Sequence, residues 1–232
     1  MDMINKESVI ILGSKPEATF PDIKVENVLA ANGAVELALL YREKYGANII
    51  VLVPSNELLK HKHIQESFVK GKPDEIVLLG EESEEATDLI KNVLNLNAEI
   101  IIFNPNERLE LMKKILGYRR YILLVKRTIL SGPRKLFSGS SLWPSCSTGL
   151  NAIFYAMVRF PEAEKYITAG IGLKSGGHFN KVGEFTDKTS QSDLITIKHW
   201  PYIKRKNVYT TDDVMSEIGG VPKWEGEILQ ND

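Results

Sequence analysis

The stretch Asn48 to Val53, NIIVLV, is a short run of mostly apolar, β-branched residues, and it decides the fold class. A strand that is apolar at successive positions is buried on both faces, which is typical of a parallel sheet covered by helices on both sides. The pattern returns along the chain in Val9 to Leu12, Asn27 to Ala31, Glu75 to Leu79, Glu99 to Phe103, Tyr121 to Val125, Tyr166 to Ala169 and Asn207 to Thr210.

Longer segments with helical periodicity separate most of these runs. They are Ala34 to Tyr45, Asn56 to Val69, Ser83 to Leu96, Asn106 to Leu116 and Thr148 to Phe160. Strands that alternate with crossover helices predict an α/β fold, with a single doubly wound, mostly parallel, Rossmann-like sheet of about seven strands and helices on both faces. With 232 residues, of which 43% are hydrophobic, the chain is expected to form one domain over residues 1–232.

Two stretches interrupt this rhythm. Lys126 to Cys146 contains glycine, proline and serine with little periodicity, and Leu173 to Gln191 is rich in glycine, lysine, serine and threonine. Both are predicted as long loops, which in compact domains are often functional. They flank the helix predicted from Thr148 to Phe160.

Composition excludes some classes of protein and sets the expected compartment. With 29 Lys plus Arg against 30 Asp plus Glu, a net charge of −1 disfavours a strongly cationic nucleic-acid binder. The single cysteine, Cys146, cannot form a disulfide within the chain and fits a reducing compartment, so the cytoplasm is expected. The chain start lacks a signal-peptide pattern and no apolar run approaches the ~20 residues that span a bilayer, so any membrane contact would be peripheral.

The two signs of charge are unevenly distributed. Residues 74–110 contain ten acids and two bases, whereas residues 111–161 contain nine bases and no acid. The plain interpretation is two solvated faces. The alternative is that Lys126, Arg127, Arg134 and Lys135 line a loop that attracts an anionic substrate or contacts the acceptor.

Polar residues follow the first two predicted strands. After the first, Gly13 admits a ligand close to the backbone, and the Ser14 hydroxyl could contact a phosphate or sugar. After the second, the Asn32 amide can donate and accept hydrogen bonds, as recognition of a base or sugar requires. Both segments could instead simply form turns. The sequence contains neither G-x-G-x-x-G nor G-x-x-x-x-G-K-[ST], so it supports neither a dinucleotide-binding site nor a P-loop.

The start of the helix predicted from Thr148 is the most specific candidate. Ser147 or Thr148 would cap this helix, which leaves backbone N–H groups and the positive end of the dipole free for an anion. The alternative is that these residues only cap. Gly149 inside the first turn costs helix stability, and the close approach of a ligand would explain it.

His178 is the best candidate for a general base among the four histidines. It follows a strand that ends in Gly170 and Gly172, so a group that titrates near neutrality would lie beside the ligand crevice. His199, expected at a helix end or in packing, is the second candidate for the base. The remaining histidines, His61 and His63, are expected on a solvated helix surface.

The other reactive groups are assigned no catalytic role. Cys146 is expected to be a small buried apolar residue rather than a nucleophile, because no Cys, His and acid pattern accompanies it. The chain has no D-x-D motif near its middle, and we therefore predict that the protein needs no metal.

Together these segments resemble the sialyltransferases, both the animal type and related bacterial enzymes. Pro144 to Leu150, PSCSTGL, followed by an apolar helix and the strand Tyr166 to Gly172, resembles their small sialyl motif. Ser175 to Phe179, SGGHF, resembles the histidine segment of the animal-type enzymes. The opening Val9 to Ala18, VIILGSKPEA, with the later asparagine, resembles the shared nucleotide-binding start, and Pro54-Ser55-Asn56 resembles a nucleotide-side loop of the bacterial enzymes.

The chain also departs from these families. Ser14 stands where they usually have asparagine, Cys146 splits the serine-threonine run, and the histidine comes earlier than the base of the bacterial enzymes. The resemblance covers roughly residues 9 to 56 and 143 to 210, and only its second block is specific.

The resemblance implies a variant GT-A fold and an inverting, metal-independent transfer of an acidic sugar, sialic acid or Kdo, from a CMP-sugar donor to a glycan acceptor. The CMP-sugar would be a co-substrate, and no cofactor is expected. The implied donor and nucleotide contacts are Gly13, Ser14, Asn32, Ser55, Asn56, Ser147, Thr148, Gly149, Gly170 and Gly172. The implied base is His178, which would deprotonate the acceptor hydroxyl.

Two other functions stay open at this stage. One is another nucleotide-dependent α/β enzyme, although Asn32-Gly33 supplies no ribose-binding acid. The other is a non-catalytic protein of the same fold that binds a nucleotide or sugar and transfers nothing.

Overall fold

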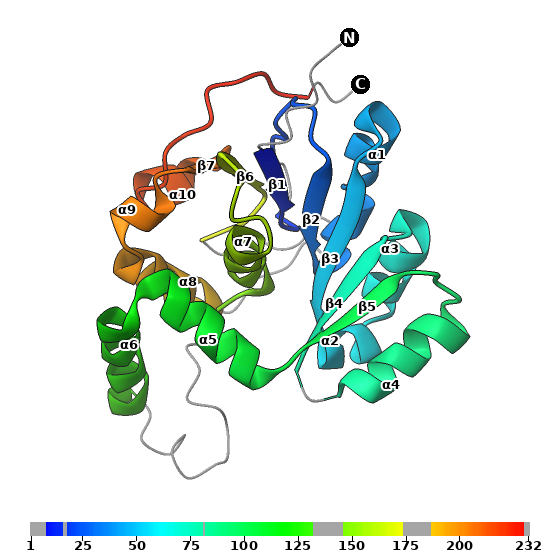
Figure 1. Cartoon of the computed structure of the whole chain (residues 1–232), viewed down its shortest axis with the longest axis horizontal. Coiled ribbons are helices and arrows are strands. Elements are labelled where there is room, and N and C mark those ends of the chain that lie inside the picture. The colour runs from blue at the N-terminus through cyan, green and yellow to red at the C-terminus, as the bar shows by residue number, and fades with distance from the viewer. Residues whose placement is uncertain (1–7, 16–17, 81, 132–145, 174–186, 230–232) are drawn as a thin grey trace.

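The computed structural model describes residues 8–15, 18–80, 82–131, 146–173 and 187–229, without the side chains of 127–131, 187–191 and 204. Its core is a seven-stranded sheet in the order β5-β4-β3-β2-β1-β6-β7 (Figure 1), and every neighbouring pair is parallel. The strands are β1 (Ser8–Leu12), β2 (Asn27–Ala31), β3 (Asn48–Pro54), β4 (Glu75–Leu79), β5 (Glu99–Phe103), β6 (Lys165–Ala169) and β7 (Val208–Thr210). The predicted α/β class, with a doubly wound parallel sheet, is confirmed.

Helices fill most of the connections between the strands. They are η1 (Asn32–Glu36), α1 (Leu39–Tyr45), α2 (Ser55–Lys60), α3 (Lys62–Gly71), α4 (Ser83–Asp88), η2 (Leu89–Val93), α5 (Pro105–Leu116), α6 (Tyr118–Ser131), α7 (Thr148–Arg159), α8 (Asp187–His199), α9 (Tyr202–Arg205) and α10 (Asp213–Glu217). Three predicted helices are divided: one into the 3-10 helix η1 and α1, one into α2 and α3, and one into α4 and the π-helix η2.

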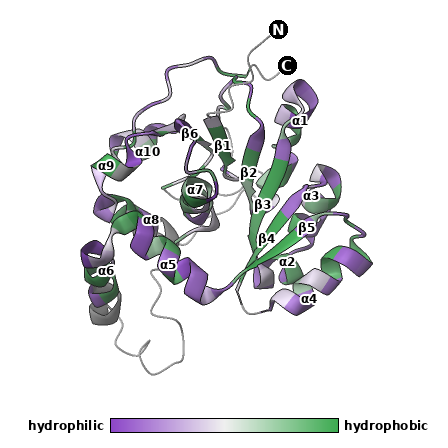
Figure 2. Cartoon of the chain, viewed as in Figure 1, coloured by the Kyte–Doolittle hydropathy of each residue, from purple (hydrophilic) through white to green (hydrophobic). Residues whose placement is uncertain are grey.

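Alternate residues of each strand enter different cores, as the two-residue period of a strand requires. In β1, Ile10 and Leu12 face one core and Val9 and Ile11 face the other. The first core lies under η1, α1, α2, α3 and α4, and the second lies under α5, α6, α7, α8 and α10. Figure 2 shows the apolar strands at the centre and polar residues on the outer helices.

The connection from β1 to β2 contains no helix in its described part. Phe20 and Val25 from this segment are buried in the first core, where they take the place of a crossover helix. The chain end packs on the same segment, because Leu229 donates its backbone N–H to the Phe20 carbonyl oxygen at 2.8 Å.

The strand predicted from Tyr121 to Val125 is wrong, because these residues lie within α6. Tyr121 and Leu124 are buried on one side of the helix, whereas Leu123 is 52% exposed. The two buried residues, Tyr121 and Leu124, are three positions apart, as on one face of a helix. An apolar run of five residues fits either such a face or a buried strand. Tertiary packing on the second core selected the helix.

Part of each predicted loop is helical in the described structure. Lys126 and Arg127 belong to α6, so they do not line a loop. Likewise, α8 begins at Asp187, within the second predicted loop.

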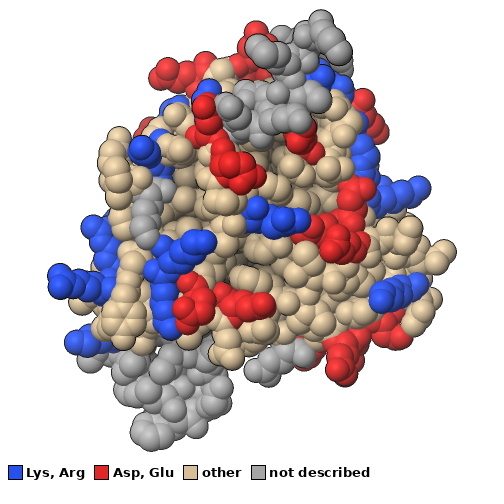
Figure 3. All heavy atoms as spheres, in the orientation of Figure 1, with Lys and Arg blue, Asp and Glu red and all other residues tan. Residues whose placement is uncertain are grey.

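Charged side chains of both signs are spread over the face in Figure 3. Lysines and arginines are frequent along its left edge, where Figure 1 has α6, α8 and α9, while acids lie at the top and centre as well as at the lower right. No helix in the described part of the chain is long and apolar enough to cross a membrane.

Candidate functional site

The order in which strands are added to the sheet reverses between β1 and β6. From β1 the chain adds β2 to β5 on one side, then returns through α5, α6 and α7 and places β6 on the other side of β1. Connections that leave neighbouring strands in opposite directions open a crevice at their carboxyl ends, where doubly wound proteins bind ligands. Gly13 and Ser14 follow β1 and Gly170 follows β6, so three predicted site residues lie at this switch point.

The turns after β1 and β6 are joined through their backbones. Gly13 donates its N–H to the Ala169 carbonyl oxygen at 2.8 Å, and Lys15 donates its N–H to the Gly170 carbonyl oxygen at 3.0 Å. A Cβ at Gly13 would lie 2.2 Å from that same carbonyl oxygen, and Gly170 has a φ of +70°. Glycine at position 13 is therefore explained by the contact between the two turns, without a ligand.

Asn32 connects the end of β2 to the start of α7. Its backbone has a φ of 52°, a conformation that asparagine tolerates better than most residues. Its Nδ2 donates to Thr148 Oγ1 at 3.4 Å, and its buried Oδ1 has no hydrogen-bond partner in the described structure. Two residues predicted independently from the sequence thus meet beside the switch point, and one buried polar atom there has no partner in the described structure.

Ser147 caps α7, as the sequence predicts. Its Oγ accepts the backbone N–H of Leu150 at 3.1 Å, and its own N–H donates to Oδ1 of Asp193 on α8 at 2.8 Å. The Ser147 amide assigned above to an anion is therefore already engaged by a carboxylate. Within the described structure, the backbone N–H groups of Thr148 and Gly149 have no acceptor, so these two amides stay available.

Gly149 has a packing explanation as well. A Cβ at this position would lie 3.1 Å from Cγ2 of Ile171, just after β6. The first turn of α7 therefore packs closely on the chain that leaves the switch point. This contact accounts for the glycine without a ligand.

Asp193 on α8 is a buried acid whose pKa is shifted toward neutrality. It is 1% exposed, and burial raises its pKa to about 6, although the hydrogen bond from Ser147 partly opposes that rise. Its Oδ2 has no partner in the described structure. A carboxylate beside a helix N-terminus interacts favourably with the helix dipole, and this one engages the N–H of Ser147.

Ser55 and Asn56, at the end of β3, lie in a separate place. Ser55 is 1% exposed, and its Oγ is 3.3 Å from Oγ of Ser83 on α4, so its hydroxyl is used within the fold. Asn56 lines a polar hollow of about 340 Å³, together with Pro54, Lys60, Leu79, Gly80, Glu82 and Arg108. Of this pair, only Asn56 borders space that a ligand could enter.

His178, Arg134 and Lys135 lie outside the described residues, as does the side chain of Arg127. Gly172 follows β6 and is partly exposed.

The other three histidines lie away from the switch point. His199 ends α8 next to Trp200, whose ring packs edge-on against Phe154 at 5.1 Å. Phe154 is six residues along α7 from Thr148, a rise of about 9 Å. His61 is exposed at the junction of α2 and α3, with its ring 5.4 Å from that of His63.

Cys146 is held in a packed environment. Its Sγ lies 3.5 Å from Thr196 Oγ1, and burial raises its pKa to about 12. A thiol with so high a pKa is a poor nucleophile at neutral pH, in agreement with the apolar role expected from the sequence.

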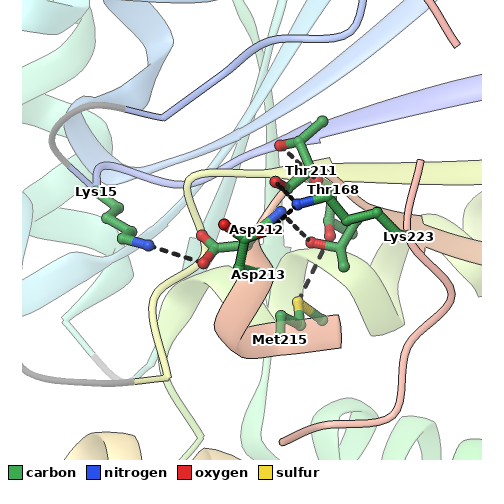
Figure 4. Close-up of polar contacts among 8 residues, drawn as sticks. Lys15, Thr168, Thr211, Asp212, Asp213, Met215 and Lys223 are labelled. Atoms are coloured by element: carbon green, nitrogen blue, oxygen red, sulfur yellow. Dashed lines mark hydrogen bonds and ion pairs between the residues drawn. The ribbon is translucent and has the colours of Figure 1, made fainter. Parts of the chain in front are cut away.

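Sequence reasoning missed an ion pair at this edge of the sheet. Lys15 Nζ lies 2.7 Å from Oδ1 of Asp212, which follows β7 (Figure 4). The side chain of Asp212 is 3% exposed and that of Lys15 is 34% exposed. Because 197 positions separate the two residues, no local pattern could have revealed the pair.

The described residues contain no group of three or more His, Cys, Asp and Glu side chains arranged to hold a metal ion. Comparisons with protein-family models, curated proteins and solved structures found no match for this chain.

Proposed function

We propose that this protein is a glycosyltransferase that moves an acidic sugar, sialic acid or Kdo, from a CMP-sugar donor to a glycan acceptor. The observation that carries the proposal is the contact between Asn32 and Thr148 beside the turns of Gly13 and Gly170. It brings one segment from each of the two blocks that resemble sialyltransferases to one edge of the sheet, where doubly wound folds bind nucleotides.

Different described residues bind different parts of the donor. The Asn32 amide recognises the cytosine or ribose, since its Oδ1 is without a partner in the described structure and amides can both donate and accept. The amides of Thr148 and Gly149 at the start of α7, which have no acceptor among the described residues, hold the donor phosphate. As CMP leaves, charge grows on that phosphate, and these amides together with the helix dipole stabilise it.

His178 is proposed as the general base that removes the proton of the acceptor hydroxyl, which then attacks the anomeric carbon in line with the departing CMP. His178 is five residues beyond Leu173, the last described residue after β6. The reaction inverts the anomeric centre and is proposed to need no metal ion. We place it in the cytoplasm because the lone cysteine fits a reducing compartment.

The test measures thermal stabilisation by CMP, UMP, UDP, GDP, AMP, NAD and S-adenosylmethionine, each with magnesium and with EDTA. A ligand that binds only the native state raises the midpoint of unfolding with the logarithm of its saturation. We expect a shift with CMP that EDTA does not change, followed by product formation from CMP-sialic acid or CMP-Kdo with an acceptor library.

Three outcomes would contradict parts of this proposal. A shift with another nucleotide alone would assign the site to a different enzyme. CMP binding without any product would indicate a binding protein of the same fold. Full turnover by His178→Ala, which should retain CMP binding and lose activity, would remove His178 as the base.

A further inference from the structure

Two lysines contact the turn between β7 and α10 from opposite sides. Figure 4 shows Lys15 reaching Asp212 from the turn after β1, and Lys223 reaching the same turn from the C-terminal segment. Lys223 forms an ion pair with Asp213 and donates to the Thr211 carbonyl oxygen at 2.9 Å. The two ion pairs are neighbours, and only that of Lys15 borders the switch point.

The two pairs differ in exposure. The side chain of Asp212 is 3% exposed and that of Asp213 is 79% exposed, while the two lysines are similar at 34% and 40%. An exposed ion pair contributes little to stability, about 0 to 1 kcal/mol, and holds neither partner firmly. The buried carboxylate of Asp212 instead fixes the position of Lys15 in the structure.

Asp212 directs its carboxylate away from its own helix. It occupies the N-cap position of α10, where aspartate usually accepts a backbone N–H of its helix, but its side chain makes no such bond. Its backbone N–H donates to Thr210 Oγ1 at 3.0 Å, which orients the turn. The described hydrogen bond of the carboxylate goes to Lys15.

Lys15 is therefore held at both ends, through its backbone N–H on Gly170 and its ammonium group on Asp212. An ammonium group has three N–H donors, and in the described structure Asp212 engages one of them. The ammonium group therefore has two further N–H donors, and it lies partly exposed after the carboxyl end of β1. A cation in that place can bind an anion without first losing the conformational freedom of a mobile lysine.

We propose that Lys15 binds the phosphate of a nucleotide at the switch point and that Asp212 is its positioning residue. The inference rests on the proposed function for the identity of the nucleotide, which is CMP. In this proposal the phosphate has two kinds of contact: the amides at the start of α7 and the ammonium group of Lys15, which lies in the turn after β1.

The experiment compares the affinities for CMP and for cytidine, which lacks the phosphate, by calorimetry. The variants are Lys15→Gln, Lys15→Arg and Asp212→Asn, with Lys223→Gln as the matched control from the neighbouring ion pair. We expect Lys15→Gln to weaken CMP binding at least roughly tenfold, the scale of a charge-assisted hydrogen bond. Cytidine binding should not change, Lys15→Arg should retain most of the CMP affinity, and Lys223→Gln should stay within about twofold of the unmodified chain.

The positioning role of Asp212 has its own readout. Asp212→Asn should weaken CMP binding by about threefold or more and leave cytidine binding unchanged, because a loosened Lys15 loses entropy when it binds phosphate. A merely structural pair would lower the melting temperature and affect the two ligands alike. Stronger CMP binding by Asp212→Asn would overturn the positioning role of Asp212.

The outcomes separate this inference from the proposed function. If the unmodified chain binds CMP and Lys15→Gln binds it within twofold, the Lys15 contact is wrong and the proposed function stands. If the unmodified chain instead binds UMP or AMP better than the matching nucleoside, and Lys15→Gln removes that preference, the Lys15 contact stands and CMP is wrong. If the unmodified chain binds neither nucleoside monophosphates nor inorganic pyrophosphate, both are overturned.

Discussion

The carboxyl ends of β2 and β3 carry similar polar residues, but the structure uses them differently. Asn32 after β2 turns its amide to the start of α7 and keeps an unpartnered oxygen within the described structure. Ser55, the first residue of α2 after β3, is buried, and its hydroxyl contacts Ser83 of α4. β2 neighbours the switch strand β1, whereas β3 is one strand further away. A polar residue after a strand is therefore a good site candidate only when its strand lies near the reversal of the sheet.

Gly13→Ala should have the largest effect on stability, because it disrupts the contact between the turns that form the switch point. The new methyl group would lie 2.2 Å from the Gly170 carbonyl oxygen, and a backbone obstacle cannot rotate away. Overpacking of this kind costs about 1–3 kcal/mol and more against rigid backbone, so we expect a loss of about 3 kcal/mol in the free energy of unfolding.

Gly149→Ala is the matched control, measured by the same urea unfolding experiment. Its Cβ would meet the Ile171 side chain at 3.1 Å, which can shift by a few tenths of an ångström. The helix propensity of alanine, worth up to about 1 kcal/mol, offsets this crowding, so little net change is expected. Equal losses in the free energy of unfolding of the two variants would show that the backbone contact between the turns tolerates a methyl group as well as the contact with Ile171 does.

Asp193→Asn should have the next largest effect and should depend on pH. Burial raises the pKa of Asp193 from 3.8 to about 6, so the folded state holds this proton more tightly than the unfolded state. The stability contributed by this group therefore increases as pH falls through 6 and is complete below 3.8. At pH 7.5 the ionised carboxylate costs at most about 3 kcal/mol, by the conversion of 1.36 kcal/mol per pKa unit.

The asparagine variant removes that cost. Urea unfolding at pH 7.5 should show it to be about 1–3 kcal/mol more stable than the unmodified chain, and the difference should shrink at pH 4.5. It should also bind CMP more tightly, because a negative charge beneath α7 is gone. Identical pH profiles for the two proteins would contradict a costly buried carboxylate at this position.

Asn32→Asp and Ser55→Ala test the comparison between the strand ends directly, and their effects on stability should be smaller than those of Gly13→Ala and Asp193→Asn. Asn32→Asp keeps a residue that tolerates a positive φ, removes the donor to Thr148 and adds a charge that repels phosphate. We expect roughly a tenfold loss of CMP affinity, the size of one hydrogen bond to a charged or polar ligand group.

Ser55→Ala should do the opposite. It removes a buried hydrogen bond, so it should cost about 1 kcal/mol of stability and leave CMP affinity unchanged. Calorimetry with CMP and urea unfolding on both variants check this pair. If Ser55→Ala weakened CMP binding as much as Asn32→Asp does, the end of β3 would belong to the site after all.

The sequence by itself determined the sheet and much of its carboxyl edge. Seven of the eight apolar runs are strands, because continuous burial on both faces leaves a pattern that is readable within a few residues. The cap at Ser147 and the place of Asn32 after β2 were also readable, since capping and turns depend on neighbouring residues. The role of His178 stays a prediction.

Only the tertiary structure decided which of these polar groups meet and what they face. Tyr121 to Val125 became a helix because packing on the second core, not the local pattern, chose between two conformations that suit five apolar residues. Asp193 reaches Ser147 across 46 positions, and Lys15 reaches Asp212 across 197. Such contacts leave no periodicity in the chain, because they depend on the order of strands in the sheet, and that order places β1 between β2 and β6.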